Sequence, residues 1–192
     1  KSHQYILGMF LAMGTFFIYP TNYAIQCAAD GYQVPAPLIT VLMALMDLIA
    51  MLIGMFFANI VKAFKEQTRF IAPLTFLCGY YILAFYPSTL MSVVGSVLVG
   101  IGSGIGIPVV FAGVGRAAAQ EAATVAMPLM SATLYLSQFL MPFIVSVGAA
   151  LSPDSWRKPY VVAIAMSLLM LIHALRKTAA TPDGDSSGSV GK

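Results

Sequence analysis

A chain of 192 residues that is 59% hydrophobic and only 9% charged cannot cover its own surface with polar groups. Soluble domains carry roughly 25% charged residues, so this composition excludes an ordinary soluble fold and indicates a protein whose solvent is lipid. The formal net charge of +3 is small and dispersed. Because the chain contains no basic run, nucleic acid is not an expected partner.

Six apolar segments follow one another along the chain, separated by charged and turn-forming residues. Apolar runs without strand-like alternation predict membrane-spanning helices and argue against a barrel. The predicted helices are Tyr5–Ile25, Ala36–Val61, Phe70–Tyr86, Thr89–Gly115, Thr124–Leu151 and Tyr160–Leu175. We therefore expect an all-α, polytopic membrane protein with one six-helix bundle over residues 1–177. Residues 178–192 are rich in Gly, Ser and Asp and are predicted to form a disordered cytoplasmic tail.

Lys and Arg are distributed unequally between the two predicted sides of the membrane. If the amino terminus is cytoplasmic, that side holds seven Lys or Arg residues near the predicted spans, and the other side holds two, Arg157 and Lys158. This is the bias of the positive-inside rule. It predicts a multi-pass protein of the plasma membrane with both termini in the cytoplasm.

Asp47 lies near the middle of the second predicted helix, and no other carboxylate of the chain is placed so deep in an apolar run. An ionisable group at that depth costs about 3 kcal/mol on insertion scales. A chain rarely keeps such a residue without a partner or a task. Asp47 therefore predicts that the helices around it enclose something polar.

The residues around Asp47 separate by size on a helical wheel of about 100° per residue. Small residues share its face: Ala36, Thr40, Ala44, Ala50, Gly54 and Ala58. The opposite face is bulky: Leu38, Leu42, Leu45, Ile49, Leu52 and Phe56. We expect another helix or a cavity on the small face, where backbones can approach closely, and lipid on the bulky face.

Polar stripes mark two further helices as candidates to line a pathway. The stripe of the first helix includes Tyr19, Asn22 and Gln26, and that of the fifth includes Tyr135 and Gln138. Together with Asp47, these residues form the predicted substrate and proton pathway.

The fourth predicted helix is rich in glycine. Gly95, Gly102, Gly106 and Gly113 fall on one face, and Pro108 also lies in this helix. Two interpretations stay open, a close packing seam and a helix that flexes during a conformational cycle. The third and sixth helices carry no charge at depth, which predicts a peripheral position. Two lining helices and one outer helix, repeated, are a sign of a three-plus-three repeat.

This arrangement resembles one half of a major facilitator superfamily transporter, whose halves consist of two three-helix inverted repeats. The best match is the carboxy-terminal half of drug-efflux-type members, over Tyr5 to about Lys177. It is carried by the consecutive stretches VGSVLVGIGSGIGIPVVFAGVGR, AAAQEAATVA and MPLMSATLYLSQFLMPFIVS. The stretch GMFFANIVKAFKEQTR stands where the family has its cytoplasmic gate motif. Gly54 and the basic residues fit that motif, but Asn59 stands near the place of its acid, and its second glycine is missing.

The resemblance implies proton-coupled efflux of an apolar or amphipathic small molecule by alternating access, with this chain as the carboxy-terminal half. In that case Asp47 would load and release a proton, and the polar side chains of the first and fifth helices would bind the substrate. The implied partners are the lipid bilayer, the substrate, protons, and either a missing amino-terminal six-helix half or a second copy. No cofactor and no metal are expected, since the two histidines lie far apart in sequence.

Two other classes compete with a transporter. An intramembrane serine protease would need an activated serine, but Ile101 stands two residues before Ser103, where a rhomboid-like motif has glycine. The chain is therefore not expected to be an enzyme. A non-transporting membrane scaffold or assembly partner is the alternative, and it predicts that helix contacts consume all the polar stripes.

Overall fold

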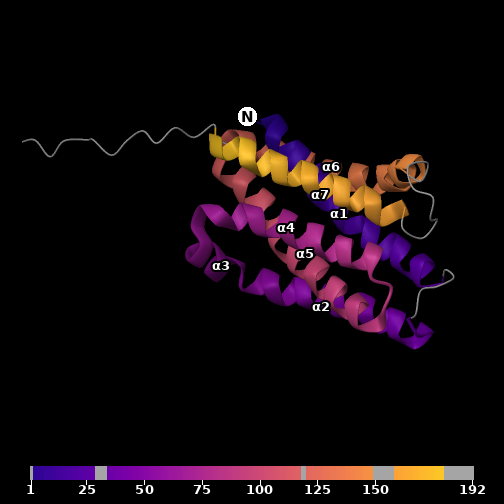
Figure 1. The fold of residues 1–192 in the computed structure, drawn as a ribbon. Helices are drawn as coiled ribbons and strands as arrows, with labels where there is room; N and C mark the ends of the chain where they lie inside the picture. The colour runs from indigo at the N-terminus through magenta and orange to yellow at the C-terminus, as the bar shows by residue number, and fades with distance from the viewer. Residues whose placement is uncertain (1, 29–33, 118–119, 149–157, 180–192) are drawn as a thin grey trace, which may run out of the picture.

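A computed structural model of the chain describes residues 2–28, 34–117, 120–148 and 158–179 (Figure 1). Its side chains are described over residues 6–28, 34–115, 125–148 and 159–176. Seven α-helices and one short 3-10 helix occupy these ranges. They are α1 (Ser2–Cys27), α2 (Ala36–Met55), α3 (Phe57–Phe64), η1 (Lys65–Gln67), α4 (Thr68–Phe85), α5 (Thr89–Ala117), α6 (Gln120–Gly148) and α7 (Lys158–Ala179).

Five segments of the described chain are long and apolar enough to cross a membrane. They are Ala36–Met55, Phe57–Phe85, Thr89–Gly115, Val125–Gly148 and Pro159–Arg176. The 26-residue helix α1 has the length of a span, but Thr15, Thr21, Asn22 and Gln26 lower its hydropathy. The all-helical, membrane-type character expected from the composition is confirmed. The predicted tail at 178–192 falls almost wholly outside the described residues, since α7 ends at Ala179.

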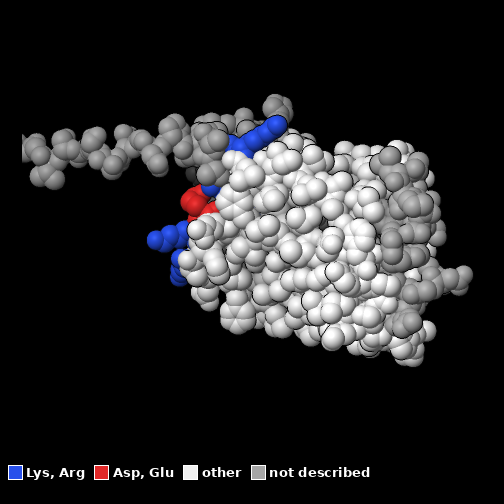
Figure 2. All heavy atoms as spheres, in the orientation of Figure 1, with Lys and Arg blue, Asp and Glu red and all other residues white. Residues whose placement is uncertain are grey.

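Successive long helices run in opposite directions along the bundle (Figure 1). This path brings the turn after α3 and the end of α7 to the same end, where α1 begins. Most charged side chains gather there, as Figure 2 shows. Among the described side chains this group comprises Lys62, Lys65, Glu66, Arg69 and Arg176. Asp47, the twelfth residue of the 20-residue helix α2, is the described charged side chain that lies elsewhere.

The first long helix of each half of the chain packs mainly on helices of the other half. Helix α5 packs on α2 and α4, whereas α1 packs on α6 and α7. The two sets meet where α4 contacts α7 and where α1 contacts α5. Thus α1 packs mainly on helices from the second half of the chain, and α5 packs mainly on helices from the first half.

Glycines on α5 allow α2 to approach its backbone. A Cβ atom at Gly100 would lie 2.7 Å from the carbonyl oxygen of Met46, and one at Gly104 would lie 2.6 Å from that of Ala50. Both distances are shorter than carbon and oxygen can adopt without displacement, so a side chain at either position would push α2 away. The bulky side chains of Ile49 and Ile53 fill the room above these two glycines.

This packing contradicts the expectation that the bulky face of α2 contacts lipid. Leu42 is fully buried, and Leu38, Leu45 and Ile49 are partly buried; only Leu52 and Phe56 of that set are exposed. The reason is physical: large apolar side chains gain more from the glycine surface of α5 than small ones would, because they fill the space that the glycines leave.

The second predicted helix is also shorter than expected. Instead of continuing to Val61, α2 ends at Met55, and Phe56 (φ −90°, ψ 6°) separates it from α3. Gly54, a weak helix former, lies two residues before this break. After α3, Lys65 adopts φ 46° and ψ −123°, close to the first central position of a type II′ turn, where glycine is normally found.

We expect Lys65→Gly to raise the free energy of unfolding by about 1 kcal/mol, because glycine adopts positive φ without a Cβ clash. Thermal unfolding in detergent, followed by circular dichroism, measures the change. The matched control is Lys62→Gly in the last turn of α3, where glycine should lower stability by up to about 1 kcal/mol. Equal destabilisation by the two substitutions would show that the Lys65 backbone is not strained.

Candidate functional site

Asp47 lies on the exposed surface of the bundle. Helix α2 buries Leu42 and Met46 against its neighbours. Asp47 is exposed, and so are Ala44 and Met51, which lie one turn before and after it on the same side of the helix. The ion pair found among the described side chains joins Arg69 to Glu66, 3.5 Å apart, and does not involve Asp47. Within the described part of the chain, the mid-span carboxylate is therefore neither covered by a helix nor neutralised by a cation.

The exposed surface of α2 has two different flanks. The flank that carries Asp47, called the acidic flank below, consists of Thr40, Ala44, Asp47 and Met51, all exposed. The other flank is bulky and apolar and consists of Val41, Leu48, Leu52 and Met55, also exposed. Hydrocarbon suits the second flank well but leaves the first with an unsatisfied acid. The two flanks therefore suit two different environments.

Helix α6 shows the same division. Its buried stripe of Met130, Thr133, Ser137 and Met141 faces the bundle, and the Ser137 hydroxyl donates to the Phe10 carbonyl of α1 at 3.0 Å. Of its exposed side, one flank is more polar: Ser131, Tyr135, Gln138 and Pro142. The other is bulky: Leu129, Leu136, Phe143 and Val147. Tyr135, 69% exposed, and Gln138 are thus available to a partner outside this bundle.

The polar residues of α1 occupy the interior instead. Tyr19 is fully buried, and its hydroxyl lies 2.5 Å from that of Ser96 on α5. Because the Ser96 hydroxyl donates to the Ser92 carbonyl at 2.7 Å, Tyr19 is the donor of this bond. Gln26 is also buried, and its Nε2 donates to the Leu83 carbonyl of α4 at 2.8 Å.

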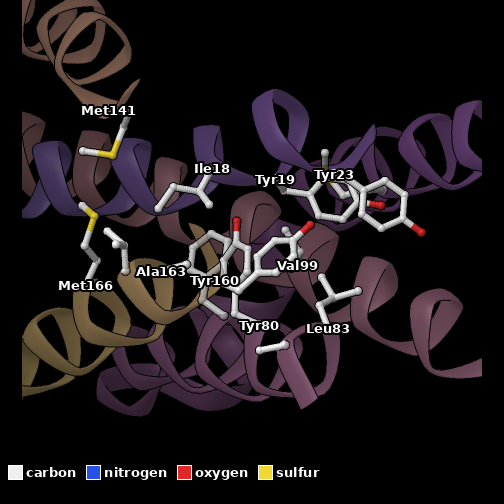
Figure 3. Close-up of a cluster of buried hydrophobic side chains, with 14 of the residues drawn as sticks. Ile18, Tyr19, Tyr23, Tyr80, Leu83, Val99, Met141, Tyr160, Ala163 and Met166 are labelled. Carbon is white, nitrogen blue, oxygen red and sulfur yellow. The ribbon is translucent and has the colours of Figure 1, made fainter. Parts of the chain in front are cut away.

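Tyr19 belongs to a group of four fully buried tyrosines with Tyr23, Tyr80 and Tyr160 (Figure 3). Tyr19 stacks on Tyr23 with ring centroids 4.6 Å apart, and Tyr80 lies 5.6 Å from Tyr160. The Tyr80 hydroxyl donates to the Thr15 carbonyl of α1. These contacts join α1, α4, α5 and α7 through aromatic surface and hydrogen bonds.

Asn22 differs from its neighbours on α1 in that it is only half-buried. Its Nδ2 donates to the Ile18 carbonyl at 3.0 Å and to the Thr21 hydroxyl at 2.8 Å, both on its own helix. Apart from Asn22, the six predicted pathway residues fall into two groups. Tyr19 and Gln26 bind neighbouring helices inside the bundle, whereas Asp47, Tyr135 and Gln138 are exposed on α2 and α6, whose main contacts are with different helices.

An open groove lies close to Asp47 between α1, α2 and α5. Its volume is about 220 Å³, and it is lined by Phe16, Ala50, Gly54, Ser103, Gly104, Ile107 and Pro108. Ala50 and Gly54 follow Asp47 by one and two helical turns. The Ser103 hydroxyl donates to the Gly100 carbonyl at 3.0 Å, so the groove is lined by apolar and small groups. The sequence signal for this groove was the set of small residues on α2 and the glycines on α5. The spacing of these residues within each helix did not show that the two sets face each other.

The glycine-rich face predicted on α5 lies largely against α4. A Cβ at Gly95 would be 2.6 Å from Leu83 Cγ, one at Gly102 would be 2.9 Å from Phe76 Cδ1, and one at Gly106 would be 3.2 Å from Ala72 Cβ. Gly113 is buried as well. Pro108, in contrast, lines the groove. The glycines thus lie in helix contacts on two sides of α5.

No three His, Cys, Asp or Glu side chains come together as a metal site among the described residues. No protein-family model and no curated protein matches the chain. The fold and the site define an all-helical protein of membrane type with an uncovered mid-span acid beside an apolar groove.

The Tyr19–Ser96 bond gives a test of the interior role of Tyr19. We expect Tyr19→Phe and Ser96→Ala each to lower stability, with a coupling energy of about 0.6 kcal/mol in a double-mutant cycle, the average for hydrogen bonds between membrane helices. Unfolding in mixed micelles measures the four proteins of the cycle. A coupling energy of zero would show that the two hydroxyls do not interact in the folded bundle.

Proposed function

We propose that this chain works in secondary active transport, as the carboxy-terminal six-helix half of a drug-efflux-like major facilitator transporter. In this proposal it carries an apolar or amphipathic small molecule by alternating access, coupled to protons. The observation that carries the proposal is the exposure of Asp47 halfway along a membrane-type helix. Its charge has to be separated from lipid by something outside this bundle.

The energetic cost of exposing Asp47 to lipid favours a second helical bundle opposite the acidic flank, with water between the two bundles. A carboxylate facing hydrocarbon costs about 3 kcal/mol or more, and the described residues of the bundle supply neither a cation nor a covering helix. A second six-helix half, or a second copy of the chain, lying against the acidic flank would remove it from lipid. An aqueous cleft between the two bodies would let Asp47 exchange protons with either side as access alternates.

The packing of α1 and α5 on helices of the opposite half of the chain supports the arrangement in two repeats. If α1, α2 and α4 form one triplet and α5, α6 and α7 the other, then the first helix of each triplet packs on the second and third helices of the other. The pairs α1 with α5 and α4 with α7 contact each other as equivalent helices would across a pseudo-two-fold axis. The charged end of the bundle would then face the cytoplasm, by the positive-inside rule.

Within this proposal the polar residues have different roles. Asp47 carries the proton, and Tyr135 and Gln138 offer hydrogen bonds to a substrate from α6. Tyr19 and Gln26 hold α1 against α5 and α4 through the bonds described above.

A membrane scaffold without transport activity is the second candidate. The bonds that Tyr19, Gln26 and Ser137 make between helices favour it, because they consume polar groups in packing. It differs from the transporter in what covers Asp47. A scaffold requires a dry partner surface on the acidic flank, whereas a transporter requires water there.

Thiol labelling distinguishes these two environments. In a protein with Cys27 and Cys78 replaced by alanine, Asp47→Cys should react with a membrane-impermeant methanethiosulfonate, because the acidic flank faces water. Leu48→Cys is the matched control at the same depth, on the bulky flank and 48% exposed in the bundle, and it should stay unlabelled. Equal reactivity at the two positions, or none at position 47, would exclude an aqueous cleft.

Proton coupling is tested on Asp47 itself. In inverted membrane vesicles from cells that produce the full-length protein, a pH gradient should drive uptake of Nile red or ethidium, an apolar and an amphipathic dye. We expect Asp47→Asn to lower this uptake at least about tenfold, because asparagine cannot bind and release a proton. Asp47→Glu should retain part of it. Unchanged uptake in Asp47→Asn would remove the acid from the mechanism.

A further inference from the structure

The charged end of the bundle is positive over its described side chains. The four basic residues Lys62, Lys65, Arg69 and Arg176 stand against one acid, Glu66, which leaves a net charge of +3. Figure 2 shows this group at one end of the molecule. In a membrane-spanning bundle such an end lies at the depth of the lipid headgroups. Its charge attracts anionic headgroups.

Helix α3 at this end has the pattern of a segment that lies at a membrane surface. One face of α3 is apolar and consists of Phe57, Ile60, Val61 and Phe64. Lys62 lies on the opposite face. No residue of α3 is buried, and the Phe64 side chain is 50% exposed. Amphipathic segments of this kind bind at the boundary between headgroups and acyl chains.

Two consecutive residues at the start of α4 carry buried polar atoms that make no hydrogen bond. Thr68 is 4% exposed, and neither its hydroxyl nor the Nε of Arg69 has a partner. An unpaired buried donor costs free energy, and a bound ion or polar group is one explanation for it. Because both atoms can donate and Arg69 is charged, an anion is the group that would satisfy them.

Arg69 is only weakly held by its present neighbours. Its Nη1 lies 3.5 Å from Oε2 of Glu66, whose side chain is 87% exposed. Ion pairs of this exposed kind contribute little. The Arg69 side chain can therefore turn away from Glu66 and open both donors to a ligand, a rotamer change that is common on binding. A phosphate matches these donors, because its oxygens accept several hydrogen bonds from the fork of a guanidinium.

The outer surface of α4 favours a phospholipid over a free phosphate. Leu74, Cys78 and Tyr81 are exposed and follow one another at helical spacing. Phe70 begins the same stripe, and the Arg69 guanidinium lies over its ring, 5.1 Å from the centroid. A phosphate on Arg69 thus has an apolar surface directly beside it, where acyl chains can lie.

We propose that Arg69 and Thr68 bind the phosphate of an anionic phospholipid at the charged end of the bundle. Lys62 and Lys65 attract the headgroup, and the acyl chains lie along the stripe from Phe70 to Tyr81. A zwitterionic headgroup binds less well, because the basic group repels its cationic part. The site lies apart from Asp47 and requires no transport.

Native mass spectrometry of the full-length protein in detergent tests the headgroup preference. With equal amounts of phosphatidylglycerol and phosphatidylcholine of the same chains, the wild type should retain the glycerol lipid about tenfold more. Arg69→Gln should abolish most of this preference. Arg176→Gln is the matched control, because it removes the same charge at the same end from an exposed residue of α7. It should keep the preference, and equal loss in the two variants would overturn the site.

Thr68→Val tests the buried hydroxyl, because valine keeps the shape of threonine and lacks the donor. In detergent without added lipid, Thr68→Val should unfold at a higher temperature than the wild type, since it removes an unpaired polar atom. Added phosphatidylglycerol should raise the unfolding temperature of the wild type more than that of Thr68→Val. An equal rise in both proteins would contradict a role of the hydroxyl in binding.

Competition distinguishes a lipid from a free anion. Sodium phosphate, compared with sodium chloride of the same ionic strength, should neither displace phosphatidylglycerol nor raise the unfolding temperature. If it does both, the site binds free phosphate and the lipid assignment is wrong. Loss of dye uptake in Asp47→Asn leaves these results unchanged, so failure of the lipid site and failure of the proposed transport are separate outcomes.

Discussion

The close approach of α2 to the glycines of α5 determines which side of α2 faces outward. Any side chain at Gly100 or Gly104 would collide with the carbonyl oxygens of Met46 and Ala50. The large side chains of α2 therefore pack against α5. Thr40 and Ala44, small residues of α2, are left on the outer surface together with Asp47. The position of the acid is thus a consequence of helix packing, and so is the groove beside it, where small residues of α2 and α5 leave space unfilled.

The hydrogen bonds of α1 hold Tyr19 and Gln26 inside the bundle, whereas the predicted pathway residues on α2 and α6 are exposed. Tyr19 and Gln26 each bind a neighbouring helix, and Tyr80 reaches back to the Thr15 carbonyl of α1. In the apolar interior such groups have no water as an alternative partner, so these bonds specify how α1 sits against α4 and α5. Asp47 and Tyr135, by contrast, have their exposed side directed away from the bundle, where a second body and a substrate would be found.

Much of the helical architecture could be predicted because hydrocarbon imposes a simple requirement, a long apolar run for each spanning helix. A helical wheel also separated the small from the bulky residues of α2. It could not identify their neighbours, so Leu42 was expected in lipid and lies in the core. Likewise Gln26 binds a residue 57 positions away, and no pattern within α1 indicates that contact. The break at Phe56 depends on local backbone geometry that hydropathy does not report.

We expect the two exposed flanks of α2 to face different environments, water for the acidic flank and lipid for the bulky one. A nitroxide scan of positions 40 to 55 in the full-length protein in bilayers tests it most directly, by comparing collisions with a water-soluble nickel complex and with oxygen. We expect two patterns displaced by about one residue: nickel maxima at Thr40, Ala44, Asp47 and Met51, and oxygen maxima at Val41, Leu48, Leu52 and Met55. Oxygen maxima on both flanks, with no nickel access at position 47, would contradict it.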